Sequence, residues 1–376
     1  MQRPSHTQSN ADDQNSTPLV SVIVPAYQHA DFIAQGIESV LNQSYPNLEL
    51  IITDDGSKDG TADVVRGFRD PRIKLEVFPE NRGAVIAVNT SIARARGKYI
   101  SLLNSDDFFL PGKLAKQVEL LERRPELAAV FGRPLFVDER GDPIDDPSLF
   151  YVQMFGDAAE EWWGDKSRFQ WLRHFFTRGN ALIHPTMMIR REVYAEVGLY
   201  DARLVQLPDF EMWVRLCMRH DICVMREHLT AFRLFRDERN VSSPKPDNMA
   251  RGAWETERIL WHFRAMSSDD IFAVFPEEMS QLALSTSLPS DLLLARLALH
   301  QHSLPHRSFG LNLLYEFAGP AGDFALAREL GAIAAAVDPF GVKAQMARSE
   351  KKKETLKTRA KSSWRKLKRR ILRAEQ

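Results

Sequence analysis

Short apolar runs alternate with helical spacings of apolar residues between Leu19 and Leu103. Four runs are rich in leucine or β-branched residues and have the length of strands: Leu19–Val24, Leu48–Thr53, Ile73–Val77 and Tyr99–Leu103. Three segments between them repeat apolar residues with helical spacing: Asp31–Gln43, Ala62–Phe68 and Ala84–Ala95. Strands that alternate with helices of this length predict an α/β fold, built of βαβ units around a largely parallel sheet with helices on both faces.

Acidic residues follow two of these predicted strands as adjacent pairs. Asp54 and Asp55 come directly after the second run, and Asp106 and Asp107 come shortly after the fourth. In open α/β sheets ligands bind outside the carboxyl ends of the strands. Adjacent carboxylates repel each other, and Mg²⁺ or Mn²⁺ commonly binds one or two carboxylates together with phosphates and water. The two pairs therefore indicate a cation site, although either pair alone could be a helix cap or a turn.

The composition excludes several other classes of protein. Hydrophobic residues make up 44% and charged residues 27% of the 376 residues, which excludes a chain that is disordered throughout. No uncharged apolar run approaches the roughly 18 residues of a membrane-spanning helix, and residues 1–17 lack the apolar core of a signal peptide. Two cysteines, Cys217 and Cys223, exclude a disulfide framework and fit a reducing compartment. We therefore expect a cytoplasmic protein.

Charge is distributed unevenly along the chain. The 50 Lys and Arg residues balance the 50 Asp and Glu residues, but residues 343–376 hold 14 of the basic residues and three of the acidic ones. The rest of the chain therefore has 36 basic and 47 acidic residues, a balance of −11. The neutral total hides an acidic body and a basic tail.

The basic tail has an apolar stripe with helical steps. Its members are Leu356, Ala360, Trp364, Leu367 and Ile371. A stripe that contains tryptophan, surrounded by Lys and Arg, is typical of a helix that lies on an anionic membrane surface. We therefore expect the protein to be peripheral on the cytoplasmic face of a membrane. A solvated or disordered basic end and a nucleic-acid-binding segment are the alternatives; the stripe favours the membrane, and no nucleic-acid partner is expected.

Longer stretches of the sequence resemble a known enzyme family. The chain contains, in this order, PLVSVIVPAYQHADFIAQGIESVLNQSYPNLELIITDDGSKDGT, ENRGAVIAVNTSIARARGKYISLLNSDD and PDFEMWVRL. Together they resemble the family 2 glycosyltransferases over about residues 18–243. The resemblance implies a GT-A fold, with a nucleotide-binding sheet, and transfer of a sugar from a nucleotide diphosphate donor with inversion at the anomeric carbon. It also implies a divalent cation, Mg²⁺ or Mn²⁺, as cofactor.

With this resemblance, we expect four parts in the chain. They are a disordered tail over 1–17, a GT-A glycosyltransferase domain over 18–243, a helical region over 244–342 and the basic amphipathic tail over 343–376. The boundary near 243 rests on Pro244–Asp247, which has the composition of a linker, and on the helical periodicity that follows it.

The resemblance assigns donor-binding roles to residues that follow the predicted strands. Six residues match such positions: Pro25, Ala26, Tyr27, Asp54, Asp55 and Arg82. The first three match the loop that lies against the nucleoside. Asp55 matches the carboxylate that accepts from the imide N–H of the base, with Asp54 beside it, and Arg82 matches a basic position near the diphosphate.

The second acidic pair matches the Asp-x-Asp-type motif of the family, written here as Asn104-Ser105-Asp106-Asp107. The resemblance implies that Asp107 binds the metal directly and that Asp106 faces the ribose or lies behind the metal. A metal at this place stabilises, as a Lewis acid, the negative charge that develops on the β-phosphate.

Asp209, in LPDFEMW, matches the catalytic base of the family. Inversion in one displacement needs one carboxylate to take the proton of the acceptor hydroxyl. Glu211 competes for this role, but residues two apart on a helix do not share a face, so only one of them can point into the site. Asp209 could also be an ordinary helix cap. The family form has an acidic residue before the Asp, where this chain has Pro208.

The acceptor side is less well marked. His184, in GNALIHPTMMIRR, is a candidate contact to the acceptor beside Glu211, with a structural role as the alternative. Many family members have a His in an Arg-x-His stretch after the sheet, where this chain has Phe235. Because phenylalanine cannot bind a metal, we expect the metal affinity to rest on Asp107 and the phosphates, with Arg233 or Arg236 contacting the diphosphate.

The combined expectation is an inverting glycosyltransferase of polysaccharide biosynthesis, whose acceptor is a glycan or a lipid-linked glycan. The alternative is a non-catalytic protein that binds a sugar nucleotide or a glycan on the same fold, and the missing His is its support. A dinucleotide-binding or P-loop protein is excluded, because no Gly-x-Gly-x-x-Gly follows a strand and no Gly-x₄-Gly-Lys-Ser/Thr occurs.

Overall fold

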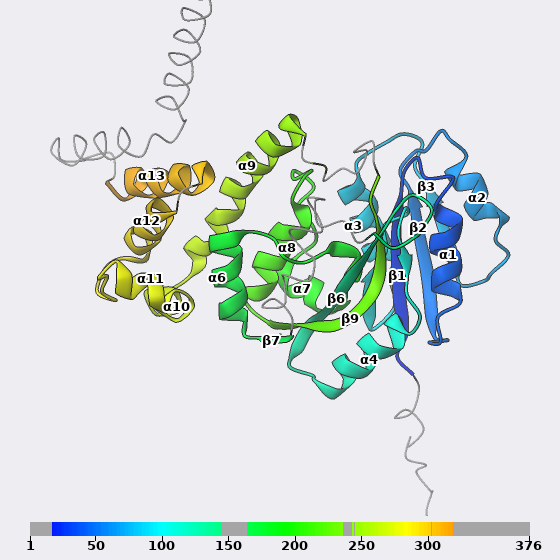
Figure 1. The fold of residues 1–376 in the computed structure, drawn as a ribbon, viewed down its shortest axis with the longest axis horizontal. Helices are drawn as coiled ribbons and strands as arrows, with labels where there is room; N and C mark the ends of the chain where they lie inside the picture. The colour runs from blue at the N-terminus through cyan, green and yellow to red at the C-terminus, as the bar shows by residue number, and fades with distance from the viewer. Residues whose placement is uncertain (1–16, 145–163, 236–242, 244, 302, 319–376) are drawn as a thin grey trace, which may run out of the picture. The chain divides into compact units, whose positions relative to one another are not determined.

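The computed structural model describes residues 17–144, 164–235, 243, 245–301 and 303–318. By their contacts, the residues divide into two compact units, Met1–Glu255 and Thr256–Gln376. The first unit holds a sheet with flanking helices, and the described part of the second unit is helical (Figure 1).

A nine-stranded sheet forms the centre of the first unit (Figure 1). Its strands are β1 (Val20–Ala26), β2 (Leu48–Asp54), β3 (Ile73–Val77), β4 (Tyr99–Leu102), β5 (Phe108–Phe109), β6 (Leu127–Val137), β7 (Gly164–Lys166), β8 (Met188–Arg190) and β9 (Asp221–Arg233). Within the described residues their order is β3-β2-β1-β4-β8-β6-β9-β5, and β7 pairs with β9. β3, β2, β1 and β4 are parallel neighbours, whereas β8 is antiparallel to both β4 and β6. The carboxyl ends of the four parallel strands therefore lie at one edge of the sheet, where such sheets bind ligands.

Helices cover both faces of the parallel strands. α1 (Ile33–Leu41) and α4 (Lys113–Arg123) belong to one apolar cluster with alternate residues of β1, among them Val22 and Val24. α3 (Ala84–Arg94) contacts β1 and β2, and its Ser91 hydroxyl lies 2.7 Å from that of Thr53. α2 (Thr61–Gly67) contacts β3 and α1. Because β1 and β2 are buried on both faces, their sequences are nearly continuous apolar runs instead of alternating ones.

The remaining helices of the first unit carry the second half of the site. They are α6 (Arg168–Arg178), α7 (Val193–Val197), α8 (Pro208–Cys217) and the first part of α9 (Pro246–Leu260). A 3-10 turn over His184–Thr186 leads into β8. Phe210 of α8 packs edge to face on Phe175 of α6 at 5.6 Å, and Trp213 packs on Phe131 of β6 at 4.8 Å. These aromatic contacts fix α8 between α6 and the sheet.

The described part of the second unit is a set of short helices. After the end of α9 come a 3-10 helix (Trp261–Ala265), α10 (Ser268–Val274), α11 (Pro276–Gln281), α12 (Ser290–His300) and α13 (Leu304–Ala318). Gly310 allows α12 and α13 to approach closely, because a Cβ there would lie 2.9 Å from Leu299 Cγ. Arg264 forms ion pairs with Asp291 at 2.9 Å and Glu316 at 2.5 Å, and so joins the 3-10 helix to both α12 and α13.

The structure confirms the predicted α/β fold. β1 to β4 match the four predicted runs to within one or two residues at each end. The predicted tail at 343–376, residues 1–16 of the predicted N-terminal tail, and residues 319–342 of the predicted helical region lie outside the described residues. Among the residues that the structure describes, no helix combines the length and the apolar character needed to span a bilayer.

Candidate active site

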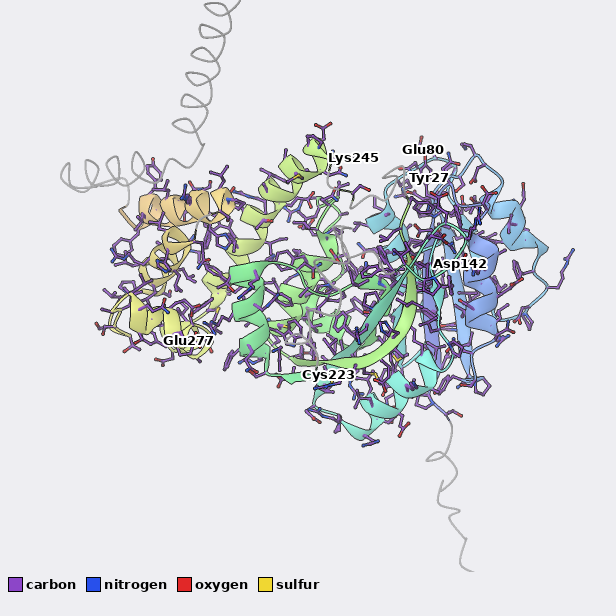
Figure 2. All side chains as sticks on the ribbon, in the orientation of Figure 1. Tyr27, Glu80, Asp142, Cys223, Lys245 and Glu277 are labelled. Atoms are coloured by element: carbon purple, nitrogen blue, oxygen red, sulfur yellow. The ribbon has the colours of Figure 1, made fainter. Side chains whose placement is uncertain are left out.

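Loops from three parallel strands meet at the carboxyl edge of the sheet. The main-chain N–H of Asp55 donates to the carbonyl of Ala26 at 2.8 Å, and that of Phe78 donates to the carbonyl of Asp54 at 2.8 Å. Gly56 has φ +74°, and a Cβ there would lie 2.5 Å from the carbonyl carbon of Glu80, so the loop after β2 contacts the loop after β3 too closely for any side chain. Tyr27 and Glu80 accordingly lie at the same end of the sheet (Figure 2).

The carboxylate of Asp55 orders the loop that carries Arg82. Its Oδ1 accepts the N–H of Arg82 at 2.6 Å, and its Oδ2 accepts the N–H of Gly83 at 2.9 Å. Asp54 is fully buried; its Oδ1 accepts the N–H of Ser57 at 2.9 Å, while its Oδ2 has no hydrogen-bond partner among the described residues. Asp55 therefore faces the loop and the sheet edge, and Asp54 lies beneath it.

Two of the expected donor-binding side chains are open to a ligand. The ring of Tyr27 is 43% exposed. The guanidinium of Arg82 is exposed and lies over the ring of Phe78, 4.9 Å from its centroid. Pro25 and Ala26 are the last residues of β1 and pair with Thr53 and Asp54 of β2. The structure thus brings these six expected donor-binding residues to one sheet edge, and the seventh, Asp106, lies in the turn after β4.

The pair Asp106 and Asp107 lies in the turn between β4 and β5. Asp107 is 2% exposed; its Oδ1 accepts the main-chain N–H of Arg233 at 2.8 Å, and its Oδ2 accepts from Nδ2 of Asn104 at 2.9 Å. Burial, followed by repulsion from Asp106, holds the pKa of Asp107 well above its ordinary value. Burial also raises the pKa of Asp106, against the attraction of His29 and Arg233. One buried and one half-buried carboxyl group therefore share a turn in which their ionised forms are unfavourable without a cation.

This donor set fits a divalent cation. Each Asp107 oxygen accepts one hydrogen bond from its protein donors and has a further lone pair. Mg²⁺ and Mn²⁺ are hard cations that use one or two carboxylates and take phosphate and water oxygens for the rest. Among the described residues, no three or more His, Cys, Asp or Glu side chains lie together in a way that could hold a metal. Asp107 and Asp106 are the residues that would hold the ion.

Arg233 has a different place from the one expected. It is 1% exposed, and its guanidinium donates to the carbonyls of Asp106, Asp138 and Glu139 and to the side chain of Gln35. It thus links the turn that holds Asp106 and Asp107 to the loop after β6 and to α1. With its guanidinium buried in these contacts, Arg233 supports the turn and is not open to a diphosphate. Arg236 lies outside the described residues.

Phe235 packs edge to face on Phe32 at 5.2 Å. It is buried, with 6% of its surface exposed. At the position where other family members are expected to have an imidazole, this chain therefore has an apolar contact.

His29 is a residue near the acid pair that the sequence pattern did not single out. Its Nδ1 lies 2.7 Å from Oγ of Ser105, and its ring packs edge to face on Phe32 at 6.1 Å. The loop after β1 therefore brings an imidazole next to the turn that holds Asp106. A histidine two residues after Tyr27 was visible in the sequence, but its neighbour Ser105 is 76 positions away.

Asp209 lies in the first turn of α8. Leu207 is the N-cap residue and Pro208 the first helical residue, so Asp209 is not the cap that was the alternative to a catalytic role. Its Oδ2 accepts from Nδ2 of Asn180 at 3.0 Å, and its Oδ1 accepts the N–H of Phe210 at 2.8 Å. Burial raises the pKa of Asp209 from 3.8 to about 6, in spite of these two donors. A carboxylate with this pKa is a better proton acceptor than an ordinary aspartate and is still ionised at pH 7.

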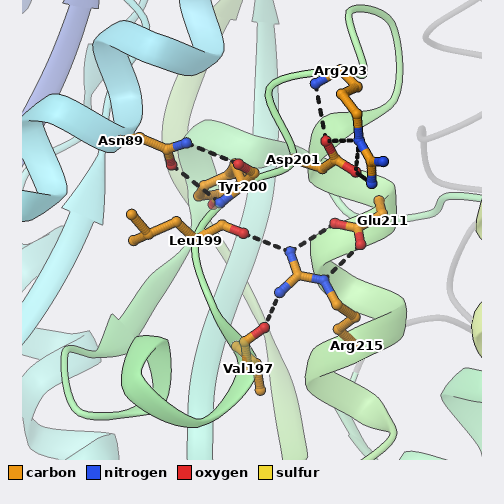
Figure 3. A network of polar contacts seen from close by, with 8 residues as sticks. All are labelled: Asn89, Val197, Leu199, Tyr200, Asp201, Arg203, Glu211 and Arg215. Carbon is orange, nitrogen blue, oxygen red and sulfur yellow. Dashed lines mark hydrogen bonds and ion pairs between the residues drawn. The ribbon is translucent and has the colours of Figure 1, made fainter.

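Glu211 forms an ion pair with Arg215 one helical turn further along α8 (Figure 3). The guanidinium gives both oxygens of Glu211 a hydrogen bond, at 2.6 and 2.7 Å. It also donates to the carbonyls of Val197 and Leu199. The pair therefore holds the loop after α7. Of the two carboxyl groups, Glu211 has an ion-pair partner among the described residues and Asp209 has none.

We expect Glu211→Gln to lower stability without removing the catalytic base. Breaking a largely buried ion pair costs about 3–5 kcal/mol, which corresponds to a fall in Tm on the order of 10 °C. Arg215→Met is the matched variant, because it removes the other half of the same pair and should give a similar fall. Thermal unfolding measures the loss, and kcat at low temperature measures the chemistry. A loss of kcat of about 10³-fold in Glu211→Gln, with Arg215→Met active, would make Glu211 the base.

His184 belongs to the surroundings of Asp209. Its Nε2 lies 2.9 Å from the hydroxyl of Tyr200, and its ring packs on Trp213 at 5.6 Å. Burial lowers the pKa of His184 to about 3, so the ring is neutral at physiological pH and acts by hydrogen bonding only. The main chain of Tyr200 in turn exchanges two hydrogen bonds with the side chain of Asn89 on α3, the helix that follows Arg82 (Figure 3). This exchange joins the surroundings of Asp209 to the donor side.

A family profile and the most similar sequences compared are all glycosyltransferases. The profile described as "Glycosyl transferase family 2" matches residues 21–198. The chain is 41% identical over 251 residues to TuaG of Bacillus subtilis (strain 168), a glycosyltransferase named for teichuronic acid biosynthesis; the match covers 66% of this chain and 87% of TuaG. It is 26% identical over 238 residues to an uncharacterized glycosyltransferase of Methanocaldococcus jannaschii, with 62% and 76% of the two chains covered.

A solved structure shares the fold. The crystal structure of S. aureus TarS 1–349 in complex with UDP superposes with a TM-score of 0.54 at 14% identity, over 88% of this chain and 91% of that chain. At this identity the likeness concerns the fold alone. The identity to TuaG over most of its length is what establishes membership: this chain belongs to glycosyl transferase family 2, with the GT-A fold, and is a glycosyltransferase.

Proposed function

We propose that this glycosyltransferase moves a sugar from a nucleotide diphosphate donor to a hydroxyl of a glycan or lipid-linked glycan, with inversion and with Asp209 as the base. The observation that carries the proposal is the carboxyl of Asp209, which lies in the first turn of α8 with its pKa raised to about 6. The neighbouring carboxyl, Glu211, is neutralised by Arg215. A single inverting displacement needs one carboxylate as base and no carboxylate as nucleophile.

Each residue then has one task in the reaction. Asp209 takes the proton from the acceptor hydroxyl as the oxygen attacks the anomeric carbon, and Asn180 holds the carboxylate in place during this step. Tyr27 stacks on the nucleoside, Asp55 accepts from the base, and Arg82 gives a charge-assisted contact to the diphosphate that leaves. His184 stays neutral and forms a hydrogen bond with the Tyr200 hydroxyl, at the side of the site where the acceptor would bind.

Asp107, with Asp106 next to it, would hold the divalent cation. When bound, the cation supplies Lewis-acid stabilisation of the charge on the leaving diphosphate. The main-chain N–H of Arg233 and the side chain of Asn104 orient the Asp107 carboxylate before any ligand arrives.

The relatives suggest where to look for the donor and the pathway. S. aureus TarS has been crystallised with UDP and with UDP-GlcNAc, and TuaG is named for teichuronic acid biosynthesis. We therefore propose a uridine diphosphate sugar as the first donor to test and a cell-surface polysaccharide as the product class.

A screen of donors tests the proposed activity. The purified chain is incubated with UDP-, GDP- and dTDP-sugars, with Mn²⁺ or with EDTA, and release of the nucleoside diphosphate is measured with water in the place of the acceptor. We expect release from one donor class and its loss in EDTA. If a nucleotide sugar binds in calorimetry but none is turned over even with glycan acceptors, the chain is a binding protein, the alternative that Phe235 supports.

The basic tail at 343–376 lies outside the described residues, so its role is proposed from the sequence. We expect deletion of residues 350–376 to release the protein from anionic vesicles of phosphatidylglycerol, because each basic residue near such a surface contributes about 1 kcal/mol. Co-sedimentation at low salt measures binding, and neutral phosphatidylcholine vesicles are the control. Unchanged co-sedimentation of the shortened chain would refute a membrane role for the tail.

A further inference from the structure

Glu255 accepts hydrogen bonds from the main chain of the segment that precedes α8. It is a residue of α9 with 1% of its surface exposed. Its Oε1 accepts the main-chain N–H groups of Val205 at 2.9 Å and Gln206 at 3.1 Å. Its Oε2 accepts those of Gln206 at 2.9 Å and Leu207 at 2.6 Å. One buried carboxylate thus binds three consecutive peptide N–H groups from a segment about 50 positions away.

The bound segment leads directly into the helix that carries Asp209. Leu207 is the N-cap residue of α8, and its own side chain makes no capping hydrogen bond. The first N–H groups of a helix have no partner within the helix and need acceptors from elsewhere. Glu255 supplies acceptors for the peptides that precede the first turn, and charge-assisted hydrogen bonds of this kind are about twice as strong as neutral ones. The direction in which α8 begins therefore depends on Glu255.

We propose that Glu255 is a positioning residue for the catalytic base: by binding residues 205–207 it fixes the start of α8 and with it the carboxylate of Asp209. This inference rests on the proposed role of Asp209. Glu255 binds peptide groups and has no place in the chemistry itself, so its effect on the reaction passes entirely through Asp209. No sequence motif marks it, because its partners lie about 50 residues earlier in the chain.

The charge of Glu255 adds a second effect on Asp209. Burial is the main cause of the raised pKa of Asp209, and the negative charge of Glu255 raises it further. The groups that act in the opposite direction are the side chain of Asn180 and the main-chain N–H of Phe210. Of the other polar groups near by, the Tyr200 hydroxyl is un-ionised because burial raises its pKa, and Arg215 is bound to Glu211. Glu255 is therefore the charged neighbour whose removal should lower the pKa of Asp209.

The test compares Glu255→Gln with a matched control. The glutamine side chain has the same shape as that of glutamate. Its NH₂ group, however, takes the place of one carboxylate oxygen and is itself a donor, so it cannot accept the peptide N–H groups that this oxygen accepts now. Glu257→Gln is the control, because Glu257 is a buried glutamate on the same helix whose partners are Arg258 and Asn312. We expect kcat of Glu255→Gln to fall about 100-fold, as displacement of a catalytic group by about 1 Å can cause, with the KM for the donor and the calorimetric Kd for UDP with Mn²⁺ unchanged.

A titration gives a readout that does not need the substrate. Carboxyl ¹³C NMR of protein labelled at aspartate, with Asp209→Asn to identify the signal, follows the ionisation of Asp209 directly. We expect its midpoint near pH 6 in the unmodified chain, a lower midpoint in Glu255→Gln and no change in Glu257→Gln. Should Glu255→Gln fail to fold, Glu255→Asp, which keeps the charge but shortens the side chain, should show the fall in kcat with a smaller shift of the midpoint.

The two proposals fail in different ways. Full turnover by Asp209→Asn would overturn the assignment of the base and, with it, the positioning role. An inactive Asp209→Asn together with unchanged kcat and midpoint in Glu255→Gln would overturn the role of Glu255 alone. A loss of UDP affinity equal to the loss of kcat would also overturn it, since the damage would then not be confined to the base.

Discussion

Asp209→Asn should lower kcat by about 10³-fold or more, since general base catalysis contributes up to about 10⁴-fold. The amide has the shape of the carboxyl and can still accept the N–H of Phe210 through its oxygen, but it cannot take a proton. The KM for the donor and the Kd for UDP with Mn²⁺ should stay within about two-fold, because the donor-binding residues lie on other elements. Steady-state kinetics and calorimetry measure both quantities. A variant with normal kcat would contradict the role of Asp209.

The pH dependence of Asp209 supplies a second, independent signature. Its pKa is raised from 3.8 to about 6 by burial, so kcat/KM of the unmodified enzyme should fall as the pH drops through about 6. A carboxyl whose folded-state pKa exceeds its unfolded value favours the folded state below the unfolded pKa, and this advantage is lost as the pH rises through the folded pKa. Asp209→Asn should therefore have a higher Tm than the unmodified chain at pH 7.5, with a smaller difference near pH 4.5. Equal Tm values at both pH values would show that the carboxyl is not desolvated.

Asp107→Ala should remove the response of the protein to divalent cations. The unmodified chain should gain Tm when Mn²⁺ and UDP are added together, because a ligand that binds the folded state stabilises it by mass action. We expect the variant to lose this gain and to lose at least about 10³-fold in kcat, since metal stabilisation of the leaving group is worth several kcal/mol and each 1.36 kcal/mol is a factor of ten.

A control separates the metal from general damage. Asp63→Ala removes an aspartate of α2 that forms an exposed pair with Arg66, and it should leave the Mn²⁺ response intact. An undiminished Mn²⁺ response in Asp107→Ala would move the metal site elsewhere.

The parallel strands of the sheet could be predicted from the sequence, because each of them is marked by a pattern of neighbouring residues. β1 and β2 are buried on both faces, so Leu19–Val24 and Leu48–Thr53 are continuous apolar runs that end at the polar residues of the sheet edge. β8 and β5 have three and two residues, and they are strands only because β4, β6 and β9 pair with them. Such pairing leaves no local pattern, so β5 and β8 could not be predicted from the sequence.

The residues of the candidate site also divide into those that a local sequence pattern marks and those that it does not. Asp55, Asp107 and Asp209 could be found because each follows a strand or begins a helix within a recognisable motif. The role of Arg233 could not be predicted in this way. Its charge suggested a contact to phosphate, whereas its guanidinium is buried and donates to the carbonyls of Asp106, Asp138 and Glu139. Glu255 could not be predicted from the sequence, because its partners are peptide N–H groups, which every residue but proline carries.

The anomeric configuration of the first product tests the proposed mechanism most directly. A nucleotide sugar whose sugar is α-linked to the diphosphate is mixed with the enzyme. The released or transferred sugar is observed by ¹H NMR before its α and β anomers can equilibrate. One displacement assisted by Asp209, with Glu211 bound to Arg215, predicts a β product and its absence in Asp209→Asn. An α product would mean retention of configuration, and it would contradict the single-base inverting mechanism proposed for this chain.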